Sequence, residues 1–237
     1  RDLELERDLG GEQRARAAGG DEGEVARVVA AAHRVDLDVL RHAELLDLQR
    51  AERGLFDMLF SADSATAWTG AESAIDRVHY VAWLEPYTLL SALSGYTKNI
   101  GLVCTATTSF EQPYFIARRF ATLDLISGGR SGWNVVTSGN ASEAYNFGRD
   151  EHYEHESRYD RAREFVEVVH GLWDSWDDDA FLYDKAGGQF YDPSRRHVLG
   201  HKGAHFSVRQ PPSGRGPATP RREKCAVQVP SGIREGR

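Results

Sequence analysis

Four polar side chains stand at positions where a protein could bind a ligand or do chemistry. Asp63 ends the apolar run LFDMLFSAD, and Thr105 lies near the end of the apolar run IGLVCTAT. His155 and Tyr159 are four residues apart, so on a helix they share one face. All four side chains can form hydrogen bonds, and the imidazole can also change its charge near neutral pH.

Each of these residues also has a purely structural interpretation. An aspartate at a strand end can cap the turn that follows it. The Thr105 hydroxyl could bond a neighbouring carbonyl, and the His155–Tyr159 pair could belong to a solvated helix start that is rich in glutamate. Asn134 and Ser138 are weaker candidates. An asparagine within the apolar letters WNVV needs a partner, which could be a ligand or the backbone.

The run EHYEHE, residues Glu151–Glu156, raises a different possibility, a metal-dependent hydrolase. Zinc proteases use H-E-x-x-H, in which two histidines four residues apart lie on one helix face. From the second histidine of the run, His155, the sequence reads HESRY, so Tyr159 stands where that motif requires histidine. We therefore predict no metal site and keep the hydrolase as an alternative.

Strand-like and helix-like patterns alternate through the middle of the chain. This alternation predicts parallel strands joined by right-handed helical crossovers, which is an α/β fold. Polar residues follow the strands, as in barrel enzymes that place their sites at the strand ends, but only three strands are evident and a closed barrel needs eight. The predicted strands are Leu55–Asp63, Ile100–Thr107 and Ser131–Ser138; the predicted helices are His42–Gly54, one from Pro86, Pro113–Ile126 and Arg158–Trp173; a hairpin is predicted over His197–Val208.

Composition narrows the class of protein. The 237 residues carry a formal net charge of -7, which disfavours nucleic acid as a partner because nucleic-acid-binding domains usually present a basic face. No apolar run is long enough to span a membrane. The two cysteines, Cys104 and Cys225, offer no disulfide framework, so we expect a reducing, cytoplasmic location.

Several phrases in order resemble the flavin-dependent monooxygenases of the bacterial luciferase-like superfamily. The resemblance runs from Ala43 to Arg209, and the branch it indicates is that of the large components of nitrilotriacetate, EDTA and dibenzothiophene-sulfone monooxygenases. The matching phrases are AERGLFDMLFSAD, EPYTLLSAL, IGLVCTATTSFEQPYFIARRFATLDLISGGRSGWNVVTS, NFG, RYDRAREFVEVVHGLWDSW and HKGAHFSVR.

The resemblance implies a partial, luciferase-like TIM (β/α)8 barrel with roughly its first half present and irregular ends. It also implies an oxygenase that takes reduced FMN from a separate flavin reductase and uses O2 to oxygenate a small organic substrate. Asp63, Thr105, His155 and Tyr159 fall on the family's flavin-contact positions, and Asn134 is added as a fifth cofactor-binding candidate. No catalytic residue is assigned, and a homo-oligomer is expected because relatives are often dimers or tetramers.

The ends of the chain depart from the family pattern. We expect residues 1–42 to be an irregular or out-of-frame leader, 43–209 a partial barrel and 210–237 a disordered tail rich in proline, glycine and arginine. The chain begins with Arg1 and has no counterpart of a later flavin-contact serine in an AG-x-S phrase, which suggests a fragment. An inactive, frameshifted remnant without catalysis is therefore the second alternative. The long loop Ser64–Leu84 is the expected specificity loop.

Overall fold

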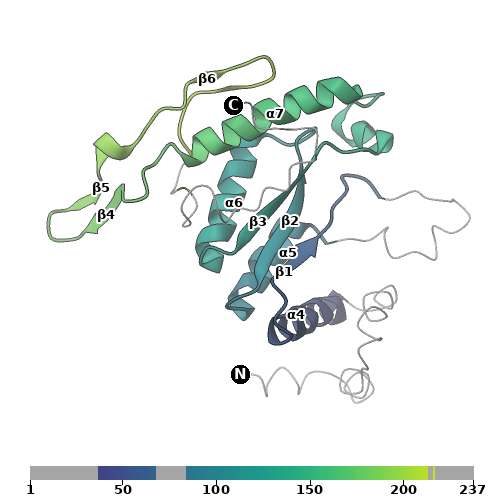
Figure 1. Ribbon diagram of the computed structural model, residues 1–237, viewed down its shortest axis with the longest axis horizontal. Coiled ribbons are helices and arrows are strands. Elements are labelled where there is room, and N and C mark those ends of the chain that lie inside the picture. The colour runs from purple at the N-terminus through teal and green to yellow at the C-terminus, as the bar shows by residue number, and fades with distance from the viewer. Residues whose placement is uncertain (1–36, 68–83, 213–215, 217–237) are drawn as a thin grey trace, which may run out of the picture.

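A three-stranded parallel sheet forms the centre of the computed structural model, which describes residues 37–67, 84–212 and 216 (Figure 1). Its strands lie in the order β1-β2-β3 and are parallel to their neighbours. Helices connect them, as parallel neighbours require. The bounds are α4 Leu37–Arg53, β1 Met58–Ser61, α5 Pro86–Leu93, η4 Ser94–Tyr96, β2 Gly101–Thr107, α6 Pro113–Ser127, β3 Ser131–Val136, η5 Ala141–Phe147 and α7 His155–Trp173.

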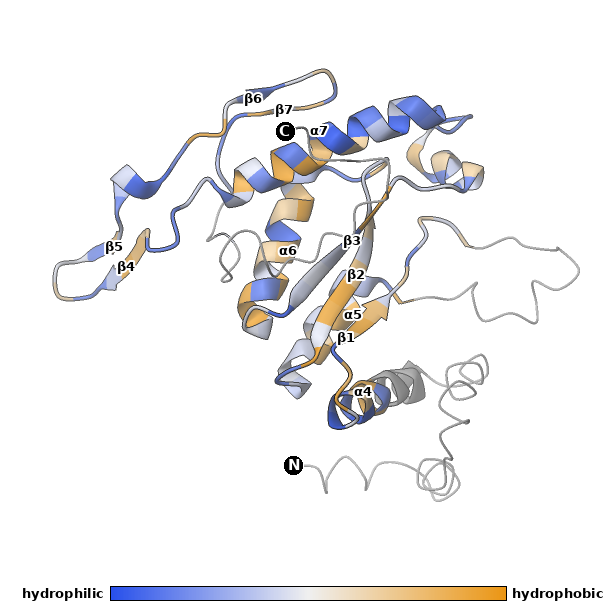
Figure 2. Cartoon of the chain, viewed as in Figure 1, coloured by the Kyte–Doolittle hydropathy of each residue, from blue (hydrophilic) through white to orange (hydrophobic). Residues whose placement is uncertain are grey.

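One face of the sheet packs against the helices and forms the core. Trp133 of β3 is fully buried, with its ring centroid 5.5 Å from that of Phe120 on α6 and 5.9 Å from that of Phe165 on α7. Alternate residues of β2, Leu102 and Cys104, are buried on the same side. Figure 2 shows apolar colouring on β1 and on much of β2, and the mixed colouring of α7 is typical of a helix with one buried face.

The opposite face of the sheet leads to the candidate site. Phe60, Val103 and Gly132 lie side by side across the three strands. A Cβ atom on Gly132 would lie only 2.8 Å from Val103 Cγ2, so glycine at this position leaves room for the Val103 side chain on the neighbouring strand. Farther along the strands the apolar layer gives way to hydroxyl groups, because the next residues of β2 on this face are Thr105 and Thr107.

Several predicted element boundaries were wrong. Helix α4 begins at Leu37 rather than His42, and α7 begins at His155 rather than Arg158. Strand β1 covers only Met58–Ser61 of the predicted range, because the chain is still turning at Leu55, whose φ is 59°. The prediction of alternating strands and helices is confirmed, whereas the predicted leader and tail lie mostly outside the described residues.

Two antiparallel hairpins follow α7. The first, β4 (Phe181–Asp184) with β5 (Gln189–Tyr191), was not predicted and extends away from the sheet (Figure 1). Between the hairpins lies a short helical turn, η6 (Pro193–Arg195). The second hairpin, β6 (His201–Lys202) with β7 (Ser207–Val208), confirms the predicted one in a shorter form.

Candidate functional site

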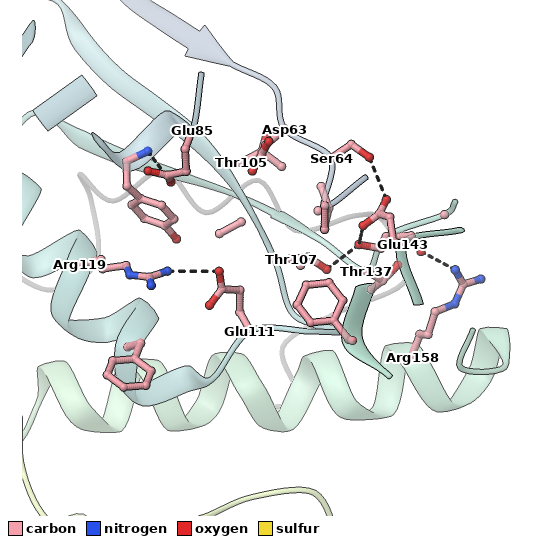
Figure 3. A pocket seen from close by; sticks show the side chains of 18 of the residues that line it. Asp63, Ser64, Glu85, Thr105, Thr107, Glu111, Arg119, Thr137, Glu143 and Arg158 are labelled. Atoms are coloured by element: carbon pink, nitrogen blue, oxygen red, sulfur yellow. Dashed lines mark hydrogen bonds and ion pairs between the residues drawn. The ribbon is translucent and has the colours of Figure 1, made fainter. Parts of the chain in front are cut away.

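A cavity of about 1200 Å³ opens at the carboxyl ends of the three strands. Its walls come from the segment after β1, the end of β2, the turn after β3 and the first turns of α7, with α5 and α6 on the other side (Figure 3). These segments are far apart in sequence. The parallel sheet brings them together, because its strands all end at the same edge. Barrel enzymes build their active sites at this edge.

Four of the five predicted cofactor-binding residues line this one cavity: Asp63, Thr105, His155 and Tyr159. The rings of His155 and Tyr159 lie together on α7, with their centroids 4.7 Å apart. Asn134 is different. Its Nδ2 donates a 3.0 Å hydrogen bond to Thr105 Oγ1, so its partner is a side chain of the site.

Asp63 has an unusual electrostatic environment. Burial by the surrounding protein raises the pKa of its carboxyl group from 3.8 to about 6, although a hydrogen bond from the Ser64 N–H opposes the shift. Three other carboxylates raise this pKa further: Glu85, Glu143 and Glu111. A raised pKa in a cleft is typical of a functional residue.

Beside Asp63 lies a hydrogen-bonded network of which the sequence analysis named only Ser138. Glu143 of η5 is only 5% exposed and accepts hydrogen bonds from Ser64 Oγ (3.2 Å) and Ser138 Oγ (2.7 Å). Ser138 Oγ lies 2.7 Å from Thr107 Oγ1. A sequence signal was present, since Asn140 caps η5 and N-x-x-E is close to a capping box. In a capping box the glutamate would accept a hydrogen bond from the N–H of the capping residue. Glu143 instead accepts hydrogen bonds from the hydroxyl groups of Ser64 and Ser138.

Arg158 connects this network to α7. Its Nη1 donates to the backbone oxygen of Ser138, which has a φ of 53°. Its buried Nε has no hydrogen-bond partner among the described residues, and Arg158 is one of the residues that line the cavity. Arg158 thereby ties the helix that carries His155 and Tyr159 to the turn after β3.

The α5–α6 side of the cavity has its own polar groups. Arg119 and Glu111 form a 3.2 Å ion pair, and the Arg119 guanidinium lies 5.4 Å from the centroid of the Tyr87 ring. Burial raises the pKa of Tyr87, and its buried hydroxyl has no hydrogen-bond partner in the described part of the chain. The cavity is therefore polar at both ends.

The geometry gives the metal-dependent hydrolase no support. Within residues 37–67 and 84–212, no group of three or more His, Cys, Asp or Glu side chains is arranged to hold a metal ion. From the run Glu151–Glu156, the ring of His152 packs against Phe110 with centroids 5.1 Å apart. Among the same residues, no helix combines the length and apolar character needed to cross a bilayer.

A parallel α/β sheet with a polar cavity at its strand ends is the arrangement found in barrel enzymes. Comparison with known proteins narrows the class. A family model described as "Luciferase-like monooxygenase" matches residues 13–227, and the chain belongs to this family. The predicted resemblance is thereby confirmed, and the three-stranded sheet is part of a luciferase-like barrel.

Curated relatives agree with this assignment. The chain is 52% identical over 161 residues to N-acetyl-S-(2-succino)cysteine monooxygenase of Bacillus subtilis (strain 168), covering 68% of this chain and 35% of the relative. It is 49% identical over 181 residues to nitrilotriacetate monooxygenase component A of Aminobacter aminovorans, covering 73% and 40%. The chain therefore spans between a third and a half of the length of these relatives.

Solved structures show the same fold. Long-chain alkane monooxygenase LadA matches with a TM-score of 0.71 at 35% identity, over 75% of this chain and 42% of its own. Riboflavin lyase RcaE, solved with modified FMN and riboflavin, matches with a TM-score of 0.67 at 34% identity, over 74% and 40%.

Proposed function

We propose that this chain forms part of the flavin site of an FMN-dependent monooxygenase, the large component of a two-component system. One observation carries the proposal: in a chain of the luciferase-like monooxygenase family, Asp63, Thr105, His155 and Tyr159 line one cavity. The substrate is a small organic molecule, and a separate flavin reductase supplies reduced FMN. The cellular location that we propose for the protein is the cytoplasm.

The cavity fits a flavin in size and in chemistry. At about 1200 Å³, the cavity is somewhat larger than the range of about 300–1,000 Å³ common for ligand pockets, so it has room for a flavin. Its walls offer hydroxyl, imidazole and phenol groups to a heteroaromatic ring, and the guanidinium of Arg158 offers a positive charge to an anionic group such as a phosphate. The relative riboflavin lyase, whose structure contains modified FMN, supports the choice of cofactor.

The residues of this chain would then bind, orient and shield the cofactor. Thr105 and Asp63, at the ends of β2 and β1, would hydrogen-bond it from below. His155 and Tyr159 would hold it from α7 by hydrogen bonds from the imidazole and the phenol. The bound flavin supplies the oxygen-transfer chemistry, since reduced flavin reacts with O2.

Thermal unfolding with and without reduced FMN under anaerobic conditions tests the proposal. A ligand that binds only the folded state stabilises it by about 2.7 kcal/mol at one hundred times its dissociation constant. We expect saturating FMN to raise the melting temperature of the purified chain and His155→Ala to abolish the increase. His197→Ala is the matched control, because His197 pairs with Asp177 and is not among the cavity-lining residues.

Failure of reduced FMN to shift the melting temperature at saturating concentration would contradict the proposal. That result would favour the inactive remnant, because a chain without a flavin site cannot begin the reaction. An equal loss of protection in His155→Ala and His197→Ala would contradict only the assigned role of His155.

A further inference from the structure

Thr107 occupies a place in the cavity that the proposed function leaves unassigned. It lies on β2 two residues after Thr105, so both side chains are on the same face of the strand. Its hydroxyl belongs to the network of Ser138 and Glu143 described above. Both of these partners are nearly buried, at 9% and 5% exposure.

The directions of these hydrogen bonds follow from the number of protons available. A carboxylate only accepts, and a serine or threonine hydroxyl has one proton to donate. Ser138 donates its proton to Glu143 Oε2. In the 2.7 Å contact between the two hydroxyls, Ser138 must then accept, and Thr107 donates its only proton.

Thr107 is therefore left without a proton for any ligand. Its Oγ1 already accepts a 3.1 Å hydrogen bond from the Ser109 N–H. A hydroxyl oxygen has two acceptor positions, so one remains on a side chain that lines the cavity. Thr105 has the opposite polarity, because its oxygen accepts from Asn134 and its own proton stays available.

We propose that Thr107 determines specificity by accepting a hydrogen bond from an N–H or O–H group of the bound molecule. Ser138 and Glu143 are positioning residues that fix this polarity. The proposal rests on the proposed function, in which the bound molecule is a reduced flavin whose ring N–H groups and ribityl hydroxyls are donors. A ligand with only acceptor atoms at this place would set its lone pair against that of Thr107 Oγ1. Such a ligand should therefore bind more weakly than one with a donor there.

Anaerobic titration of the purified chain with reduced FMN, followed by the tryptophan fluorescence of the protein, tests the role of Thr107. Thr107→Val keeps the shape but removes the acceptor, and we expect the dissociation constant to rise on the order of tenfold, the effect of one lost hydrogen bond. Thr107→Ser retains the hydroxyl and should restore binding. Thr122→Val is the matched control, because Thr122 lines the same cavity but its hydroxyl bonds the Arg118 carbonyl (2.8 Å).

A double-mutant cycle tests the roles of the positioning residues. Ser138→Ala should weaken FMN binding when Thr107 is present and have no further effect in Thr107→Val, since Ser138 acts through Thr107. A residue that merely stabilised the fold would lower affinity additively in both backgrounds. Ser64→Ala removes the other hydroxyl bonded to Glu143 and should leave the effect of Thr107→Val unchanged.

The possible results separate this inference from the proposed function. FMN binding by the unaltered chain, with Thr107→Val no weaker than Thr122→Val, overturns the inference alone. Additive effects of Ser138→Ala and Thr107→Val overturn the assignment of Ser138. Absence of reduced-FMN binding by the unaltered chain overturns the proposed function, and this inference with it.

Discussion

At the scale of single residues, the site depends on a carboxyl group that the fold keeps from ionising easily. Asp63 has its pKa raised to about 6, first by burial and then by the neighbouring carboxylates. Near neutral pH, the charge of this group responds to whatever binds beside it. An anionic flavin would raise the pKa of Asp63 further, so proton uptake should accompany binding.

The raised pKa predicts how Asp63 affects stability. A carboxyl group whose pKa is higher in the folded state destabilises that state once pH exceeds the unfolded-state value near 3.8, and the cost is complete above about 6. Asp63→Asn should therefore raise the free energy of unfolding at pH 7 to 8. We expect a gain on the order of 1 kcal/mol, less than the full pKa shift implies, because the carboxyl group is only partly buried and solvent screens its charge. Below pH 4 it should change little.

Urea unfolding of both proteins across this pH range is the measurement. Asp57→Asn serves as the control, since it makes the same change at another exposed aspartate close to β1. A stabilisation by Asp63→Asn that is independent of pH would rule out the electrostatic explanation.

The sequence predicted the placement of some site residues better than others. Asp63 and Thr105 follow apolar runs, and parallel strands end at a common edge, so their proximity could be inferred. His155 and Tyr159 share a helix face by spacing alone. Glu143 was missed because one of its partners, Ser64, is 79 residues away, and no local pattern reports such a contact.

At the scale of elements, a single glutamate fastens the β6–β7 hairpin to α7. Glu164 Oε1 accepts from His201 Nε2 at 3.0 Å and from the Phe206 N–H at 2.8 Å, and Oε2 accepts from the His205 N–H at 2.9 Å. Burial opposes ionisation of Glu164. The hydrogen bonds from the hairpin outweigh burial and lower its pKa from 4.5 to about 2.

Glu164→Ala should release the hairpin. Hydrogen bonds to a charged group contribute about 1.5–3 kcal/mol each, and solvent access here places the expected loss of unfolding free energy near the lower value. Hydrogen exchange at the His205 and Phe206 amides should accelerate. Glu167→Ala, at an exposed position of the same helix, is the control and should change neither quantity.

The lowered pKa of Glu164 also gives this contact a pH dependence. Its stabilisation is complete above the unfolded-state pKa of 4.5 and is lost as pH falls toward about 2. The difference in unfolding free energy between the unaltered chain and Glu164→Ala should therefore shrink over this interval. A constant difference would show that packing, and not charge, holds the hairpin.

Elements were predicted best where periodicity was long. The apolar stripe of α7 predicted a helix, and the run before Thr107 predicted a buried strand. The β4–β5 hairpin was missed although FLYDKAGGQFY has aromatic residues on both sides of a turn sequence. Its strands pack on Trp176, with the Phe181 ring centroid at 4.8 Å, and this tertiary contact is not visible in a local pattern.

At the scale of the whole molecule, the described residues form an open part of a barrel. Strand β1 is at one edge of the sheet, with no second strand beside it among these residues. Met58 and Phe60, on the face turned away from the helices, are 57% and 49% exposed. Exposed sheet edges and large exposed apolar side chains both favour association.

The open face predicts that this chain self-associates through β1. Phe60→Glu places a charge on the exposed face, so burying that face against another chain would require burying the charge. We expect sedimentation velocity to show concentration-dependent association of the unaltered chain and a shift toward monomer for Phe60→Glu. Ile126→Glu is the matched control, because Ile126 is 53% exposed but lies on α6, away from this face. Equal dissociation by both substitutions would place the contact elsewhere, and a monomer at every concentration would show that the face is covered within the chain.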